Sequence, residues 1–131
     1  MAKVAGVPPD YFNENGQRWN MPVYNWECLK QSGYKWWLDR IRRNLELFDL
    51  VRLDHFRGFS DYWVVDVSEE TAKNGQWVKG PGDEFFKVLK KEFPKMPFAT
   101  EDLGDVDKTI YDIRDRYDLP GMRVLQFAFG N

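Results

Sequence analysis

The sequence predicts an α/β protein built on a parallel sheet. Segments whose apolar residues recur with helical spacing alternate with short apolar segments of strand character, in the order helix, strand, helix, strand, helix, strand. This alternation is typical of parallel strands joined by right-handed crossover helices. A length of 131 residues suits one domain, and 43% hydrophobic residues are enough to bury a core.

Composition narrows the class of protein. The formal net charge of −2 argues against a nucleic-acid partner, which requires a basic face. No apolar run reaches the ~18 residues of a membrane span, so we expect no membrane partner. Cys28 is the one cysteine, which excludes an intramolecular disulfide and favours a reducing compartment, the cytoplasm. The 6 Trp, 6 Tyr and 10 Phe form either an aromatic core or a site lined with flat rings, as sugar binding requires.

Residues 1–31 are expected to form one long, ordered loop before the first helix. From residue 4 onward, Pro, Gly and Asn interrupt any sustained period. Aromatic residues are spread through the segment: Tyr11, Phe12, Trp19, Tyr24 and Trp26. Disordered tails contain few aromatics, whereas long loops inside compact domains tend to be lids or binding loops. We therefore expect an active-site loop over 1–31 and β/α units over 32–131, within a single domain.

The middle of the chain contains two predicted helices and two predicted strands. Ser32 is a candidate N-cap of the first helix, which carries Arg40 on its solvated side. The apolar face of that helix is formed by Tyr34, Trp37, Leu38, Ile41, Leu45 and Phe48. A strand over 50–54 follows. Asp83 is a candidate cap of the second helix, which Pro94 ends, and 96–100 form the second strand.

A third helix and a third strand complete the pattern. Asp107 is a candidate cap for a helix with Val106, Ile110, Ile113 and Tyr117 on one face. The Pro120-Gly121 pair ends this helix, and the residues 122–129 read as a strand. We therefore expect about three parallel strands.

The strand over 50–54 brings an arginine beside an aspartate. Arg52 and Asp54 are two residues apart, so they share one face of the strand where it ends. Chemistry in α/β proteins collects at the C-terminal ends of parallel strands. A nearby guanidinium keeps the carboxyl group ionised, as a nucleophile requires. A purely structural ion pair is the alternative.

Glu101 ends the next strand and gives Asp54 a chemical partner. Adjacent parallel strands lie about 4.8 Å apart, and a retaining glycosidic pair needs carboxyl groups about 5–5.5 Å apart. Paired carboxylates on one rim therefore suit glycosyl transfer, with one as nucleophile and the other as acid/base. A metal site is the competing use, with Asp54, His55, Glu101 and Asp102 as candidate ligands, although their spacing matches no specific metal motif.

Several motifs resemble those of the 4-alpha-glucanotransferases called amylomaltases or disproportionating enzymes, relatives of the α-amylase clan. The similarity covers nearly the whole chain and keeps the family's order. Its motifs are AGVPPDYF at 5–12, GQRW at 16–19, VRLDHFRG at 51–58, WVKGPG at 77–82, EDLG at 101–104 and LPGM at 119–122. The family usually has Gly after the Trp of the second motif, where this chain has Asn20.

The resemblance implies part of a (β/α)₈ TIM barrel that acts on α-1,4-glucans, such as malto-oligosaccharides, without metal or cofactor. It assigns the nucleophile to Asp54, the general acid/base to Glu101 and the residue that holds nucleophile and substrate to Arg52. Asp102 is an expected substrate contact, although its place next to Glu101 on a strand could also aim it away from the sugar. The residues that approach the donor and acceptor sugars from the loop are Asp10, Tyr11, Phe12, Gln17 and Trp19. His55 either donates a hydrogen bond to sugar or packs beside Phe56.

The implied mechanism is a double displacement. Glu101, protonated in a partly apolar site, protonates the departing glycosidic oxygen while Asp54 attacks the anomeric carbon. Glu101 then takes the proton from the 4-hydroxyl of an acceptor glucan. An aromatic-rich loop over the cleft favours transfer because it excludes water.

A complete (β/α)₈ barrel needs at least about 200 residues, so the chain reads as an excerpt of one. The family's third catalytic acid and its neighbouring His lie further along than residue 131. We therefore expect the isolated chain to be inactive, and its open strand edges to be covered by self-association or by a longer protein. The alternatives are a non-catalytic glucan-binding or interaction module and a metal-dependent hydrolase.

Overall fold

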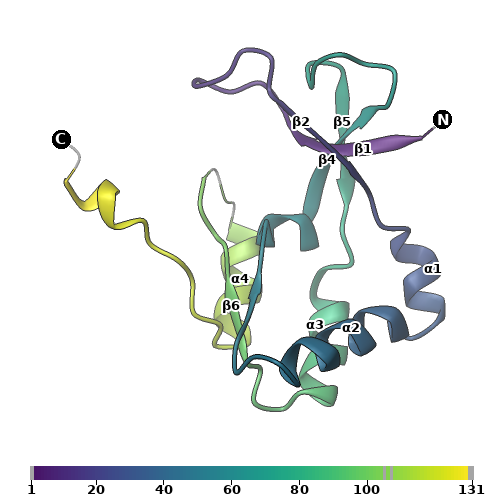
Figure 1. Cartoon of the computed structure of the whole chain (residues 1–131), viewed down its shortest axis with the longest axis vertical. Coiled ribbons are helices and arrows are strands. Elements are labelled where there is room, and N and C mark those ends of the chain that lie inside the picture. Colours follow the sequence, from purple (N-terminus) through teal and green to yellow (C-terminus); the bar gives the residue numbers. More distant parts are fainter. Residues whose placement is uncertain (1, 105, 107, 130–131) are drawn as a thin grey trace.

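The computed structural model describes residues 2–104, 106 and 108–129 and contains two separate sheets (Figure 1). The parallel sheet pairs β3 (Val51–Leu53) with β6 (Phe98–Thr100). These strands confirm the predictions over 50–54 and 96–100 and their parallel direction. Each contributes one buried apolar side chain, Leu53 from β3 and Phe98 from β6, and their crossover contains a helix, as parallel pairing requires.

Three helices pack around the parallel pair. They are α2 (Lys35–Leu45), α3 (Gly82–Glu92) and α4 (Lys108–Arg116). The apolar faces of all three meet in one core, whose most deeply buried side chains are Phe56, Phe85, Phe86, Phe98, Ile41, Leu89 and Ile110. The core also includes Leu53 and Phe56, which come just before and after Asp54 in the sequence.

The second sheet is antiparallel and was not predicted. Its order is β2-β1-β4-β5, from β1 (Lys3–Val7), β2 (Gln17–Pro22), β4 (Asp61–Asp66) and β5 (Gly75–Lys79). The prediction of one long loop over 1–31 is therefore wrong, because β1, β2 and the helix α1 (Trp26–Gln31) lie in this segment. The loop that connects β1 to β2 is confined to residues 8–16. The short strand β1 forms by pairing with β4, about sixty residues away, which no local pattern reveals.

Two predicted helix caps are wrong. Ser32 ends α1 instead of starting α2: its hydroxyl donates to the carbonyl of Leu29. Gly33 and Tyr34 then both adopt left-handed backbone angles, so α2 begins only at Lys35. Asp83 lies inside the first turn of α3 and contacts Arg116, Lys87 and Tyr117 rather than capping the helix. The candidate cap Asp107 lies outside the described residues.

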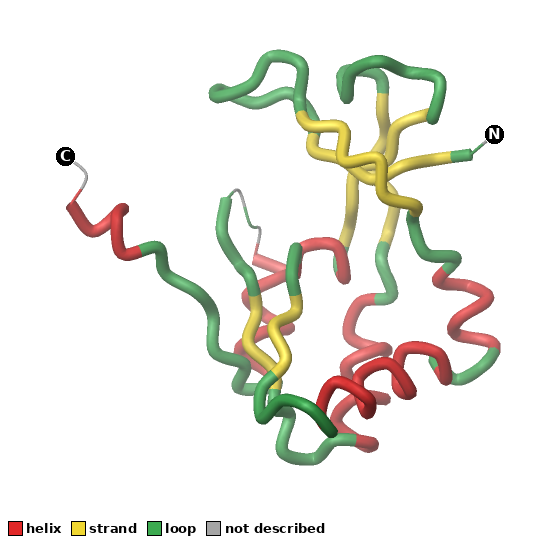
Figure 2. Tube along the Cα trace, viewed as in Figure 1, coloured by secondary structure: helices red, strands yellow, loops and turns green. Residues whose placement is uncertain are grey.

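The predicted third strand over 122–129 is also wrong. The segment leaves the helices as an extended stretch and ends in a 3₁₀ helix, η2 (Leu125–Phe129), seen at the yellow end of the chain (Figures 1 and 2). A strand forms only beside a partner that accepts its backbone hydrogen bonds, and η2 has no strand next to it in the described part of the chain. Its apolar side chains Leu125, Phe127 and Phe129 are exposed. Two parallel strands, not three, are therefore present among the described residues.

None of the described helices combines the length and apolar character that crossing a membrane requires.

Candidate active site

The ends of β3 and β6 bring Asp54 and Glu101 to the same rim. Leu53 pairs with Thr100, so each carboxylate is the first residue after its strand. The backbone of Glu101 continues the ladder on both sides: its N–H donates to the carbonyl of Leu53 at 3.0 Å, and its carbonyl accepts the N–H of Phe56 at 3.1 Å. The expected placement of both residues at one strand rim is thus present.

The Glu101 carboxylate is held by two backbone donors. Oε2 accepts the N–H of His55 at 3.0 Å, and Oε1 accepts the N–H of Leu103 at 2.9 Å. Both oxygens therefore have fixed directions, and one of them is tied to the residue that follows Asp54. This arrangement couples the position of Glu101 to the turn after β3.

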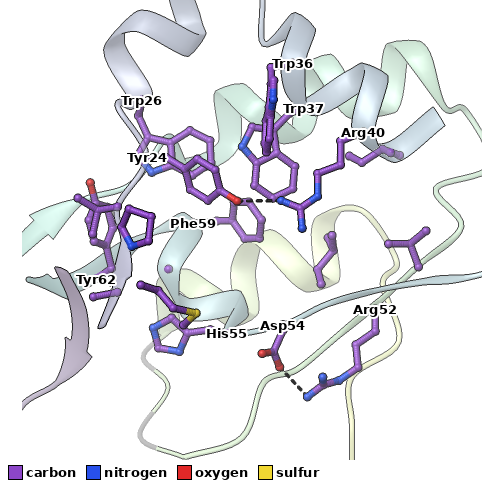
Figure 3. Close-up of a pocket in the computed structure, with 18 of the residues that line it drawn as sticks. Tyr24, Trp26, Trp36, Trp37, Arg40, Arg52, Asp54, His55, Phe59 and Tyr62 are labelled. Carbon is purple, nitrogen blue, oxygen red and sulfur yellow. Dashed lines mark hydrogen bonds and ion pairs between the residues drawn. The ribbon is translucent and has the colours of Figure 1, made fainter. Parts of the chain in front are cut away.

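Asp54 lies beside Arg52 at the mouth of a groove (Figure 3). Its Oδ1 is 2.7 Å from Nη2 of Arg52, and its side chain is 70% exposed. The same guanidinium donates from Nε to the sulfur of Met122 at 3.1 Å. The expected Arg52–Asp54 pair is present, and the exposed carboxylate is accessible to a ligand.

His55 turns its ring into the groove next to Asp54. Its backbone is left-handed, with φ of 46°, which directs the chain from β3 into the short 3₁₀ helix η1 (Phe56–Phe59). The ring lies edge-on to Trp19 with centroids 4.8 Å apart. Burial lowers the pKa of His55, although the carboxylates of Glu101 and Asp54 oppose the shift. The imidazole is therefore neutral at pH 7 and has both a donor and an acceptor nitrogen.

Aromatic side chains form the opposite wall of the groove (Figure 3). The cavity has a volume of about 710 Å³, and its aromatic lining consists of Trp19, Tyr24, Trp26, Trp36, Trp37, Phe59 and Tyr62. Arg40 lies over the rings of Trp36 and Trp37 and donates to the hydroxyl of Tyr24 at 2.9 Å. Sequence reasoning placed Arg40 on a solvated helix face and missed this wall; the adjacent tryptophans at 36 and 37 were the available signal.

The loop residues expected to approach sugars are only partly brought together. Trp19 lines the groove, and Gln17 accepts its indole N–H at 3.1 Å. Asp10 accepts the backbone N–H groups of Phe12 and Asn13, so its carboxylate folds the loop tip. Tyr11 and Phe12 are 97% and 93% exposed and do not line the groove.

Asp102 does not face the groove. Its side chain has no exposed surface and contacts Arg114 and the backbone of Met122. Burial raises the pKa of Asp102, but the Met122 N–H and the Arg114 guanidinium outweigh it, so the pKa lies below its usual range. Asp102 is therefore ionised and lies inside the protein. Its side chain points away from the groove, the second of the two directions expected for the residue next to Glu101.

Asn20 stands where the family motif usually has glycine, and its backbone conformation is one that suits glycine. Its φ is 59°, in the left-handed region that glycine adopts without strain and that asparagine tolerates better than most residues. Asn20 therefore adopts a backbone conformation that a glycine at the same position would also adopt.

Acidic, histidine and cysteine side chains of the described residues form no group of three or more that could hold a metal ion. Asp102, one of the four candidate ligands, points away from the other three towards Arg114.

An α/β fold with two carboxylates at one strand rim beside an aromatic groove is typical of proteins that act on carbohydrates. Over residues 1–131 the chain matches a family model described as 4-alpha-glucanotransferase. The chain belongs to this family.

Known relatives agree with this assignment. The chain is 54% identical over 126 residues to a 4-alpha-glucanotransferase of Aquifex aeolicus, covering 96% of the chain and 26% of the relative. It is 52% identical over 126 residues to the enzyme of the same name from Thermus thermophilus, covering 96% and 25%. The fold resembles that of amylomaltase from Streptococcus agalactiae in complex with acarbose, with a TM-score of 0.92, 38% identity and coverage of 98% and 26%. The chain thus spans about a quarter of the length of these relatives.

Proposed function

We propose that this chain is a segment of the catalytic (β/α)₈ barrel of a 4-alpha-glucanotransferase that disproportionates malto-oligosaccharides. The observation that carries the proposal is the register of β3 and β6, which pairs Leu53 with Thr100 immediately before the two carboxylates. A retaining mechanism requires two carboxyl groups about 5–5.5 Å apart, and adjacent parallel strands, which lie about 4.8 Å apart, allow this spacing. The names of the relatives provide the reaction class.

In the proposed reaction, Asp54 attacks the anomeric carbon and forms a covalent glucosyl intermediate. Glu101 gives its proton to the departing glycosidic oxygen and then removes a proton from the 4-hydroxyl of the acceptor. Arg52 holds Asp54 in the orientation for attack. These roles need no metal or cofactor.

The groove fits a sugar chain better than a small polar substrate. Trp19, Trp36 and Tyr24 provide flat apolar surfaces within one cavity, and Asp54 and His55 add hydrogen-bonding groups to the same lining. Flat rings beside a few polar groups suit the apolar faces and hydroxyls of glucose units. We propose that donor or acceptor glucose units occupy the part of the groove next to Trp19.

We further propose that the 131-residue chain does not turn over substrate alone and acts within a longer cytoplasmic protein. A third carboxylic acid is part of the family's site by resemblance and is not among the residues of this chain. The exposed thiol of Cys28 favours a reducing compartment, because such a thiol oxidises readily elsewhere.

A chimera tests the proposed function. The 126 matched residues of the Aquifex aeolicus relative are replaced by those of this chain, and maltotriose is incubated with the chimera and with the chain alone. Chromatography of the products is expected to show longer and shorter glucans from the chimera and none from the chain alone. Asp54→Asn in the chimera is expected to lower the rate by at least about 10³-fold, because it removes the nucleophile.

The same assay separates the alternatives. A folded chimera that binds maltotriose without turnover would support a non-catalytic glucan-binding segment. Activity that survives Asp54→Asn would exclude Asp54 as the nucleophile, and activity lost on adding a chelator would support a metal-dependent enzyme.

A further inference from the structure

The buried carboxylate of Asp102 connects two segments next to the proposed catalytic residues. It follows Glu101 in the sequence, yet its side chain points into the protein. Its Oδ2 lies 2.7 Å from Nη1 of Arg114 on α4, and its Oδ1 accepts the backbone N–H of Met122 at 2.8 Å. A buried charge is stable only when it is paired and hydrogen-bonded, so these contacts fix the chain around residue 122 to the end of β6.

The segment before Met122 is seated closely on the same carboxylate. The carbonyl of Pro120 accepts the N–H of Thr100, the last residue of β6, at 2.8 Å. A Cβ added to Gly121 would lie 2.4 Å from Oδ2 of Asp102, so only glycine allows this approach. The backbone over 120–122 is therefore held at two points by residues at the end of β6, Thr100 and Asp102.

Met122 connects Asp102 to the neighbouring strand β3. Its sulfur accepts a hydrogen bond from Nε of Arg52 at 3.1 Å, while Nη2 of the same guanidinium lies 2.7 Å from Asp54. A guanidinium is planar and rigid, so fixing Nε also fixes the directions of its Nη donors. The half-exposed Arg52 would otherwise be free to adopt other rotamers.

We propose that Asp102 is a positioning residue for the Arg52–Asp54 pair. Its carboxylate holds Met122 in the place from which the methionine sulfur aims the arginine at Asp54. Asp102 itself touches no substrate. The consequence for reactivity rests on the proposed function, in which Asp54 is the nucleophile.

A spectroscopic experiment on the full 131-residue chain tests the contacts directly. The chain has four methionines, and ¹³C labelling of their methyl groups gives each a separate NMR signal. Asp102→Asn and Arg52→Lys are both expected to move the Met122 signal, because each removes one end of its contacts. Met96, buried in the core, is the internal reference for folding. A Met122 signal that neither substitution moves would overturn the proposal.

Two further variants keep this test informative. Asp112→Asn is the matched control, because it removes a surface ion pair with Lys108 on α4 and is expected to leave the Met122 signal in place. Arg114→Lys keeps a positive charge opposite Asp102 and is the milder substitution if Asp102→Asn unfolds the chain. It is expected to move the Met122 signal by more than the control Asp112→Asn does, and no such movement would count against the proposal.

Kinetics of the chimera test the effect on reactivity. Asp102→Asn is expected to lower kcat by about 10²-fold with little change in KM, as a small misplacement of a reacting group does. The loss is expected with maltotriose and also with maltotriosyl fluoride, whose leaving group needs no proton from Glu101. Turnover of the fluoride at the wild-type rate would overturn the proposal, because Asp102 would then act only through Glu101.

A double substitution identifies the route. If Asp102 acts through Met122, adding Met122→Leu to Asp102→Asn lowers kcat no further, and additive losses contradict the route. An inactive wild-type chimera would refute the proposed function instead of these contacts, which the methyl signals report independently.

Discussion

At the scale of single residues, the two proposed catalytic carboxylates are held in different ways. Asp54 is exposed and contacts a side chain, whereas both oxygens of Glu101 accept backbone N–H groups. A nucleophile must reach an incoming anomeric carbon, and an acid/base must keep its direction through two steps. The surroundings of the two groups fit this division of roles.

The histidine between these carboxylates has a testable protonation state. His55 is the one histidine of the chain, so its ring protons give an unambiguous NMR titration. Burial lowers its pKa, and we expect a midpoint below the usual value of about 6.5. Since the folded pKa is lowered, the unfolded state binds more protons, and stability falls as the pH drops through about 6.5 towards the folded pKa. A midpoint above 6.5 would show that Glu101 and Asp54 outweigh burial.

The left-handed turn at Asn20 gives a second prediction. Asn20→Ala and Asn20→Gly both remove the side chain that accepts a hydrogen bond from Arg18, so their difference isolates the backbone. Because φ is 59°, the alanine variant is expected to be less stable than the glycine variant by about 1 kcal/mol. Urea unfolding measures this difference. Equal stabilities would mean that the turn relaxes without strain.

At the scale of elements, the sequence predicted the helices and strands whose apolar pattern is contiguous in the chain. The strands over 50–54 and 96–100 and the α3 and α4 regions follow from contiguous apolar patterns. The sheet β2-β1-β4-β5 does not, because β1 depends on a distant partner, and the strand expected over 122–129 has no neighbour among the described residues. The predicted cap at Ser32 is wrong because the left-handed angles of Gly33 and Tyr34 delay the start of α2 to Lys35, and the predicted cap at Asp83 is wrong because α3 already begins at Gly82.

The same distinction holds for the site. The shared rim of Asp54 and Glu101 could be predicted from two strand ends. The sequence left both directions open for Asp102, and the adjacent tryptophans 36 and 37 signalled only part of the aromatic lining, because the lining joins side chains from several elements whose packing no local pattern specifies.

The aromatic core beneath the site gives a prediction for α3. Phe85 is fully buried, and its ring lies 5.1 Å from that of Tyr34 and 5.4 Å from that of Phe59. Phe85→Ala is expected to cost about 3–5 kcal/mol of the free energy of unfolding. Phe127→Ala in η2 is the matched control, since Phe127 is 75% exposed, and is expected to change stability by less than about 0.5 kcal/mol. Similar losses in denaturant unfolding would contradict the assigned core.

At the scale of the whole molecule, the parallel sheet of two strands is incomplete by itself. The side of β3 opposite β6 has no strand beside it in the described part of the chain, and η2 exposes apolar residues. Unpaired edges and apolar patches favour association. The family relatives are about four times as long as the matched segment, which leaves room for further strands in the proposed longer protein.

We therefore expect the isolated chain to self-associate. Light scattering is expected to give a mass above the 15.6 kDa of one chain, increasing with protein concentration. A stable monomer at high concentration would count against self-association.

The central claim is that Asp54 is the nucleophile and Glu101 the acid/base of a retaining pair. The most direct measurement is mass spectrometry of the Glu101→Gln chimera after reaction with maltotriosyl fluoride. The fluoride leaves without acid help, but the acceptor then lacks its base, so the covalent intermediate accumulates. We predict one maltotriosyl group on Asp54, the single carboxylate between Arg52 and Arg57. An adduct on another residue, or none in a chimera whose Glu101 form is active, would contradict the claim.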